Sequence, residues 1–249
     1  MSGCLLQKKM TAVNFGCLVF LLTMMLASAA QKHTNIVIVG GTGDLARKYL
    51  WSSALSLFVN NFNENTTFSF YAGARVSQED GTKTLTDILD KVICEMGDED
   101  CSRLRPTFIE NSKYEILKSG DHYKNLCKSF RNQPTGLNLP SLDLRQIFYL
   151  SVPSSAYESV ARLIDENCRH EGTTTQIVLE KPFGLDKVSA SDQVTAINKH
   201  FLDDEVHRVD HYLAKPVTKQ ILNFRYVFKK NTYCVATNTT LRKHFEIES

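Results

Sequence analysis

The sequence predicts an α/β fold built on a doubly wound parallel sheet, and three observations lead to this class. A continuous run of β-branched side chains at residues 35–39 is typical of a parallel strand that is buried on both faces. A glycine-rich turn at residues 40–43 leads from this strand into a segment with apolar residues at helical spacing. Strand-like and helix-like segments then alternate, which indicates parallel strands joined by right-handed crossovers.

The individual elements are predicted from the periodicity of their apolar residues. Strands are expected at residues 35–39, 68–74, 146–152 and 175–179. Helices are expected at residues 44–58, 84–96, 155–168, 189–201 and 216–228. The second of these helices carries its apolar stripe at Leu85, Ile88, Leu89, Val92 and Ile93. Residues 97–144 read as polar and irregular, with short amphipathic pieces around residues 123–130.

The glycine-rich turn matches the fingerprint of a dinucleotide-binding, Rossmann-like domain. Gly40-x-x-Gly43-x-x-Ala46 follows a predicted strand and opens a predicted helix, which is the setting that the fingerprint requires. Glycines let the backbone approach a pyrophosphate, and the N–H groups of the helix start hold its charge. Counting from Gly41 satisfies the related Gly-x-Gly-x-x-Ala spacing, so the register stays open. The candidate cofactor-binding residues of this turn are Gly40, Gly41, Thr42, Gly43, Asp44 and Leu45.

The end of the second predicted strand bears on the choice of dinucleotide. An acidic residue at this place accepts the ribose 2′-hydroxyl of NAD, whereas an arginine suits the 2′-phosphate of NADP. The chain has Arg75 here and no acidic residue before Glu79. This favours NADP as the cofactor, with NAD kept as an alternative. A solvated surface arginine is the other interpretation of Arg75.

Charge and cysteine spacing narrow the class of protein further. A formal net charge of +2 gives no reason to expect a nucleic-acid partner. The chain contains no Cys-x-x-Cys pair, so no metal site is expected. Cys94 and Cys101 flank an acidic turn and could form a disulfide in an oxidising compartment, while buried free thiols are the alternative.

The first 30 residues differ in composition from the rest of the chain. Lys8 and Lys9 precede an uncharged apolar run at residues 15–26, and small residues follow it. This order predicts a cleaved secretory signal peptide, with an uncleaved signal anchor as the alternative, and no stable membrane span after cleavage. Asn65 and Asn238 begin glycosylation sequons, which matter only in a secretory lumen. We therefore expect the protein in the lumen of the endoplasmic reticulum.

Four motifs, in the same order and at the same spacing, carry a resemblance to a known family. They are GGTGDLA at residues 40–46, FYLSVP at 148–153, EKPFG at 180–184 and DHYLAK at 210–215. Together they resemble the glucose-6-phosphate dehydrogenase family over about residues 33–228. Ser154 stands where a second proline is usual, and Ala214 where glycine is usual. The signal peptide points to the luminal hexose-6-phosphate dehydrogenase branch of the family.

The resemblance implies a reaction and a role for each motif. The reaction is the oxidation of glucose 6-phosphate to its lactone with NADP, the first step of the oxidative pentose phosphate pathway. Lys181 would contact the sugar near the nicotinamide, beside Pro182 in a cis or strained turn, and Tyr149 would bind the dinucleotide. Asp210 would orient the histidine that takes the proton from the C1 hydroxyl, so Lys181 and Asp210 are the candidate catalytic residues. The substrate phosphate would be bound by His211, Tyr212 and Lys215.

The resemblance also implies a second domain that supplies the catalytic histidine, and the chain ends before that domain. His244 is the last histidine, and its setting does not resemble the family's base. We expect a signal peptide at 1–30, a nucleotide-binding domain at 33–205 and, at 206–249, the start of a truncated substrate domain with an atypical tail. Family members form homo-oligomers through the absent domain, so the resemblance extends no oligomeric state to this chain.

Three hypotheses about function follow. The first is a partial or short form of a luminal dehydrogenase. The second is a non-catalytic fragment that binds NADP and a sugar phosphate. The third is an unrelated oxidoreductase with the same fold.

Overall fold

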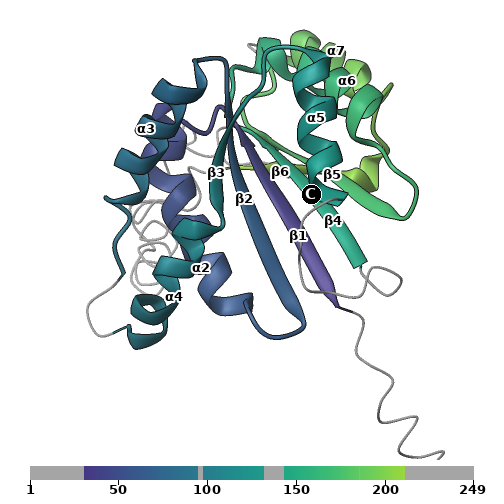
Figure 1. Cartoon of the computed structure of the whole chain (residues 1–249). Helices are drawn as coiled ribbons and strands as arrows, with labels where there is room; N and C mark the ends of the chain where they lie inside the picture. The colour runs from purple at the N-terminus through teal and green to yellow at the C-terminus, as the bar shows by residue number, and fades with distance from the viewer. Residues whose placement is uncertain (1–30, 95–97, 132–142, 185, 211–249) are drawn as a thin grey trace, which may run out of the picture.

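A parallel six-stranded sheet forms the centre of the structure (Figure 1). The computed structural model describes residues 31–94, 98–131, 143–184 and 186–210. The strands follow the order β3-β2-β1-β4-β5-β6 and all neighbours are parallel. Their bounds are β1 (Lys32–Val39), β2 (Thr66–Ala74), β3 (Ser112–Ile116), β4 (Asp143–Leu150), β5 (Thr173–Glu180) and β6 (Val206–Val209). This is the strand order of the doubly wound dinucleotide-binding fold, so the predicted fold class is confirmed.

Helices cover both faces of the sheet in two layers (Figure 1). One layer holds the π-helix η1 (Ala46–Leu50), α2 (Trp51–Asn61), α3 (Gln78–Leu89) and α4 (Glu99–Glu110). The other holds α5 (Gly120–Arg131), α6 (Tyr157–Cys168) and α7 (Lys187–Ile197), with the single turns η3 (Ser154–Ala156) and η4 (Asp203–Glu205). Val37 and Val39 pack under the second layer and Ile38 under the first, so β1 is buried on both faces as its β-branched run predicts.

The helix predicted at residues 84–96 differs from α3 at both ends. α3 starts six residues earlier than predicted, because Ser77 caps it by accepting a hydrogen bond from the N–H of Asp80 at 3.1 Å. Its first turns are polar on all sides, which hid this start from the periodicity. The predicted stripe is wrong at Ile93, which lies beyond the helix and is 81% exposed. Three stripe residues within α3 are buried in the core: Leu85, Ile88 and Leu89.

The stretch predicted to be irregular contains three elements, α4, β3 and α5. Asp98 caps α4 by accepting a hydrogen bond from the N–H of Cys101 at 2.8 Å. The helix carries Pro106 in its interior and charged residues along its exposed side, so its sequence shows little helical signal. β3 is a short edge strand that pairs with β2, and Tyr114 is its one buried residue. A five-residue strand with one buried side chain shows too little alternation to be predicted.

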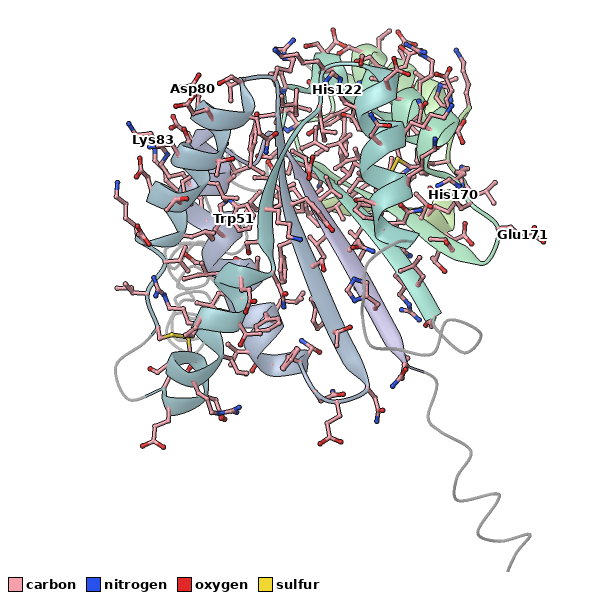
Figure 2. The ribbon with its side chains drawn as sticks, viewed as in Figure 1. Trp51, Asp80, Lys83, His122, His170 and Glu171 are labelled. Carbon is pink, nitrogen blue, oxygen red and sulfur yellow. A yellow bond between two sulfur atoms is a disulfide. The ribbon has the colours of Figure 1, made fainter. Side chains whose placement is uncertain are left out.

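Two disulfides join segments of the helical layers, and Figure 2 draws them in yellow. Cys94–Cys101 ties the segment after α3 to the first turn of α4, so of the two alternatives for this pair the disulfide is the one observed. Cys127–Cys168 ties α5 to α6 across 41 residues of sequence, and both of its side chains are fully buried. This second bond was not predicted, because the two cysteines meet only when α5 and α6 pack together.

The sheet extends past residue 205, the boundary predicted between the two domains, because β6 pairs with β5 as far as Val209. The predicted signal peptide, the second sequon, the helix at 216–228 and the tail lie outside the described residues. Within the described ranges no helix has the length and apolar character that a membrane crossing requires. The same part of the chain holds no group of three or more His, Cys, Asp or Glu side chains that could bind a metal.

Candidate functional site

The ends of four strands bring most of the candidate residues to one edge of the sheet. Because β1, β4, β5 and β6 are parallel, their carboxyl ends share this edge. The glycine turn follows β1, Tyr149 lies next to the end of β4, and Lys181 and Asp210 directly follow β5 and β6. The strand order reverses between β1 and β4, and ligands of open α/β sheets bind at such a reversal.

Gly40 makes the tight turn out of β1. Its φ of +88° lies in the left-handed region that favours glycine, and a Cβ built there would lie 2.2 Å from the carbonyl oxygen of Ser151. Its N–H donates to the carbonyl oxygen of Gly73 at 2.7 Å, so the turn is held between the ends of β2 and β4. A turn that only glycine can make at this residue favours counting the fingerprint from Gly40.

Some main-chain N–H groups of the glycine turn form hydrogen bonds within the protein, and others remain as donors for a ligand. The N–H of Gly41 donates to Gly73 at 3.2 Å, and the N–H of Gly43 donates to Gly40 at 2.9 Å. Helical hydrogen bonding begins with Arg47, whose N–H donates to Gly43 at 2.9 Å. The donors that remain for an anion are therefore the amides of Thr42 and of the first helical residues, starting with Asp44.

Trp51 supports the glycine turn from beneath. Its indole Nε1 donates a hydrogen bond to the carbonyl oxygen of Gly41 at 2.9 Å, and its side chain is fully buried. Phe108 packs edge-on against it, with ring centroids 6.4 Å apart. No role for Trp51 was predicted from the sequence. The one sequence feature that could have indicated this role is the place of Trp51 shortly after the glycine fingerprint.

Arg75 follows the last residue of β2 and is exposed. Since β2 is parallel to β1, Arg75 lies at the same edge of the sheet as the glycine turn. It forms no ion pair with any other residue in the described part of the chain. Its guanidinium is thus available to an anion at the carboxyl edge.

Tyr149 and Glu180 form a hydrogen-bonded pair between the ends of β4 and β5. The Tyr149 hydroxyl donates to Oε1 of Glu180, whose residue is only 8% exposed. Burial, reinforced by this hydrogen bond and by the nearby carboxylate charge, raises the pKa of Tyr149 far above its usual value. The Tyr157 hydroxyl donates to the main-chain oxygen of Glu180 at 3.0 Å. Neither Glu180 nor Tyr157 was among the predicted site residues.

Lys181 and Asp210 lie at the ends of neighbouring strands. The Lys181–Pro182 peptide bond is cis, which agrees with the cis or strained turn implied by the resemblance. The Lys181 side chain is exposed, and its main-chain N–H donates to the carbonyl oxygen of Val209 at 3.1 Å. This bond ties the EKPFG motif to Val209, the residue before Asp210. Asp210 itself is half-buried. The three predicted phosphate ligands lie outside the described residues: His211, Tyr212 and Lys215.

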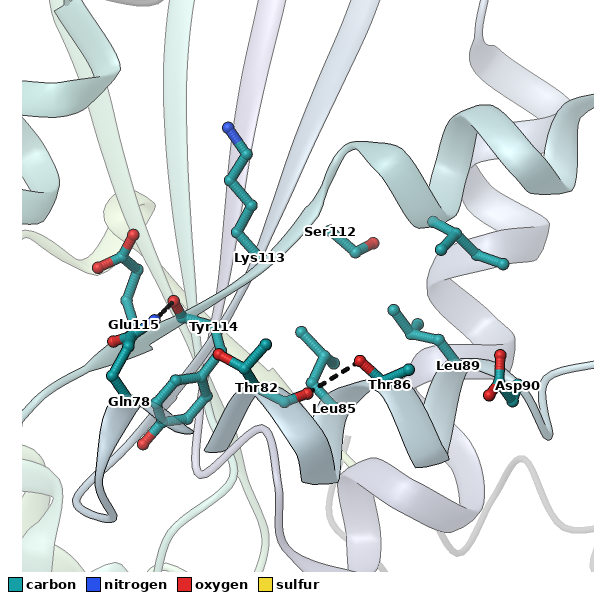
Figure 3. A pocket seen from close by; sticks show the side chains of 11 residues that line it. Gln78, Thr82, Leu85, Thr86, Leu89, Asp90, Ser112, Lys113, Tyr114 and Glu115 are labelled. Atoms are coloured by element: carbon teal, nitrogen blue, oxygen red, sulfur yellow. Dashed lines mark hydrogen bonds between the residues drawn. The ribbon is translucent and has the colours of Figure 1, made fainter. Parts of the chain in front are cut away.

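A cavity of about 370 Å³ lies between α3 and the edge strand β3 (Figure 3). Its lining mixes polar and apolar side chains and includes Thr82, Leu85 and Lys113. Gln78 closes one end by donating a hydrogen bond from its side chain to the carbonyl oxygen of Tyr114 at 2.9 Å. The predicted site residues do not line this cavity. We therefore place the candidate site at the strand ends, where the glycine turn and the polar side chains meet.

The fold and the strand-end site define a dinucleotide-binding domain of the doubly wound class. Residues 37–220 match the family described as "Glucose-6-phosphate dehydrogenase, NAD binding domain". The chain belongs to this family.

Several known proteins are similar to the chain. The human "GDH/6PGL endoplasmic bifunctional protein" is 37% identical over 208 residues, which are 82% of this chain and 26% of that protein. The glucose-6-phosphate 1-dehydrogenase of Saccharomyces cerevisiae is 28% identical over 79% of this chain and 38% of its own length. A solved structure, "Glucose-6-phosphate dehydrogenase in complex with its substrate glucose-6-phosphate", aligns with a TM-score of 0.64 and 26% identity, covering 81% of this chain and 41% of that one. The chain thus spans less than half the length of these relatives.

Proposed function

We propose that this chain is the dinucleotide-binding part of an oxidoreductase of the glucose-6-phosphate dehydrogenase type. The reaction is the oxidation of glucose 6-phosphate to 6-phosphogluconolactone with NADP. The observation that carries the proposal is the convergence of the glycine turn, Tyr149, Lys181 and Asp210 on one edge of the sheet. Family membership supports it, and so does the likeness to a solved structure described as a complex with the substrate glucose 6-phosphate.

The residues at this edge suit the chemistry of that reaction. Oxidation at C1 of the sugar removes a hydride from the carbon and a proton from its hydroxyl, and a bound dinucleotide accepts the hydride. The exposed ammonium of Lys181 would donate hydrogen bonds to a sugar oxygen and attract the phosphate dianion. Asp210 would orient a general base. The phosphate would be held by His211, Tyr212 and Lys215.

NADP is the cofactor that we propose, because Arg75 is exposed at the end of β2 and an arginine at this place suits a 2′-phosphate. The glycine turn would hold the pyrophosphate through the amides of Thr42 and Asp44. Gly40, Gly41 and Gly43 would permit its close approach, with Leu45 in the first turn of the helix. The domain bounds predicted from sequence are 33–205 and 206–249, and we propose to move the boundary to about residue 209, because β6 belongs to the sheet of the first domain.

The lumen of the endoplasmic reticulum is the compartment that we propose. Two disulfides among the described residues suit an oxidising compartment. Asn65 is exposed in the turn before β2, where its sequon would be open to a glycan. The human and rabbit relatives are named as endoplasmic proteins.

The test is NADPH formation by the purified full chain, followed by absorbance, with and without glucose 6-phosphate. We expect slow turnover, because the resemblance places the histidine base in a second domain, and we expect it to depend on the sugar phosphate and to be lost in Lys181→Ala. The matched control is Lys199→Ala, which changes another exposed lysine, just past the end of α7. Binding of both NADP and glucose 6-phosphate without turnover would favour the second hypothesis, a non-catalytic fragment that binds these ligands. Binding of neither ligand would overturn the proposal.

A further inference from the structure

Glu180 is a buried acidic residue at the carboxyl edge of the sheet. It is the last residue of β5 and only 8% of its surface is exposed. A buried carboxylate destabilises a fold unless hydrogen bonds compensate for its lost hydration. One such bond comes from the hydroxyl of Tyr149 on the neighbouring strand. Because Glu180 lies at the candidate ligand-binding edge, we relate the free-energy cost of burying its carboxylate to a role in ligand binding.

The hydrogen bond has a direction, and this direction determines what Tyr149 can offer to a ligand. A phenol has one proton, and Tyr149 donates it to Glu180. The remaining lone pairs of the Tyr149 oxygen can only accept a hydrogen bond. A phenol at its ordinary pKa of about 10 already keeps its proton at neutral pH, and the raised pKa of Tyr149 extends this arrangement to more alkaline pH.

The main chain of Glu180 is held in place independently of its side chain. The hydroxyl of Tyr157, the first residue of α6, donates to the Glu180 carbonyl oxygen at 3.0 Å and accepts from the Glu180 N–H at 3.3 Å. The next residue, Lys181, donates its N–H to Val209 at 3.1 Å. A main chain fixed on both sides lets the carboxylate act as a rigid acceptor for Tyr149.

We propose that Glu180 is a positioning residue for the dinucleotide site, whose carboxylate orients the Tyr149 hydroxyl so that the phenol oxygen accepts a hydrogen bond from an amide or hydroxyl group of the ligand. The role depends on the hydrogen bond to Tyr149 and not on the negative charge as such. This inference rests on the proposed function, since it assumes that a dinucleotide binds at this edge.

Two variants of Glu180 separate the hydrogen bond from the charge. Glu180→Gln keeps an acceptor oxygen at the same reach and removes the charge. Glu180→Asp keeps the charge and shortens the side chain by one methylene, which withdraws the acceptor from Tyr149. We expect the NADP dissociation constant, measured by calorimetry on the full chain, to stay within about threefold in Glu180→Gln and to rise about tenfold in Glu180→Asp.

The Tyr149→Phe variant completes the test as one side of a double-mutant cycle. We expect it to weaken NADP binding by about as much as Glu180→Asp, and the double variant to bind no more weakly than either single variant. A merely structural Glu180 would instead give additive losses and no retention of affinity by glutamine. Additive losses would overturn the inference. So would a Tyr149→Phe affinity equal to that of the unchanged chain, and this result does not depend on the folding of Glu180→Asp. No NADP binding by the unchanged chain would overturn the proposed function together with the inference.

Discussion

The indole Nε1 of Trp51 donates a hydrogen bond to the carbonyl oxygen of Gly41, 2.9 Å away. Trp51 is the one tryptophan of the chain and is fully buried. The tryptophan emission of the protein therefore reports on the turn that we assign to the pyrophosphate. We expect it to decrease in a saturable manner when NADPH is added, because the reduced nicotinamide accepts excitation energy from a nearby indole. Emission that falls only in proportion to added NADPH, without saturation, would contradict this assignment.

Replacing Trp51 with phenylalanine tests its role as a support for the turn. We expect Trp51→Phe to lower the free energy of unfolding by about 1–3 kcal/mol, because it removes a buried hydrogen bond and leaves unfilled space. Urea unfolding followed by circular dichroism measures this change. The control is Tyr49→Phe, at a residue that is 48% exposed, for which we expect a change within about 0.5 kcal/mol. Equal stabilities of the two variants would contradict the supporting role.

Two glycines with positive φ form a second matched pair. Gly40 has φ +88° and no room for a Cβ, whereas Gly172 has φ +75° and nothing within 4 Å of the place that a Cβ would take. We expect Gly172→Ala to cost about 1–2 kcal/mol from the backbone conformation alone. Gly40→Ala should cost more than Gly172→Ala and also abolish NADP binding, because the added methyl group displaces the turn. Retention of NADP affinity by Gly40→Ala would contradict the place assigned to the pyrophosphate.

The two disulfides should contribute unequally to stability. Cys127–Cys168 closes a loop across 41 residues and Cys94–Cys101 one across 7. By chain entropy, we expect the double alanine variant of the longer loop to lose about 4 kcal/mol and that of the shorter loop about 2.5 kcal/mol. Urea unfolding without reductant measures both variants. A larger loss of stability in the variant without Cys94–Cys101 would show that the entropy of the unfolded chain does not determine how much each disulfide contributes.

Arg169 binds the segment that leads into β6, and this contact predicts a dependence of stability on pH. Its guanidinium forms hydrogen bonds of 2.7 and 2.8 Å with Glu205 and one of 2.6 Å with Asp165. The hydrogen bonds from Arg169, followed by one from the N–H of Leu202, hold the pKa of Glu205 below its ordinary value of 4.5 despite partial burial. A lowered folded-state pKa contributes stability above the unfolded pKa, and this contribution is lost as the pH falls through the folded pKa.

Glu205→Gln should therefore be less stable than the unchanged chain at pH 6, and the difference should shrink as the pH falls below about 4.5. Urea midpoints measured between about pH 3 and 6 test this expectation. Glu110→Gln, at an exposed residue at the end of α4, is the control for a change of net charge. A stability difference that is constant with pH would contradict the proposed contact.

Much of the central sheet could be predicted from sequence because its inner strands are apolar and β1 is buried on both faces. The β-branched run of β1 and the apolar residues of β4 and β5 are typical of buried parallel strands. α4 and β3 could not be predicted, because a helix with an interior proline and a short edge strand lack a regular apolar period. Their places depend on contacts between distant residues, such as those of Phe108 with Trp51.

The candidate site was predictable where glycine or charge marked it, and not where its role depends on packing. The glycine turn and Lys181 follow predicted strands, so parallel topology alone brings them to one edge. Asp210 joins them there because it follows β6, a strand that was not predicted. Glu180 opens the EKPFG motif after a predicted strand, but the sequence does not show that its side chain meets Tyr149, and Tyr157 carries no signal of either kind. Their relationship exists because the start of α6 packs against the end of β5, which sequence periodicity does not specify.

The measurement that tests the central claim most directly is the titration of the full chain with NADP and with NAD, in parallel with its Arg75→Ala variant. We predict saturable binding of NADP about tenfold tighter than that of NAD, because a charged hydrogen bond to the 2′-phosphate is present only with NADP. In Arg75→Ala we expect the affinity for NADP to fall to that for NAD, while the affinity for NAD stays unchanged. Absence of saturable binding of either dinucleotide would contradict the assignment of the site, and equal affinities in the unchanged chain would contradict the role of Arg75.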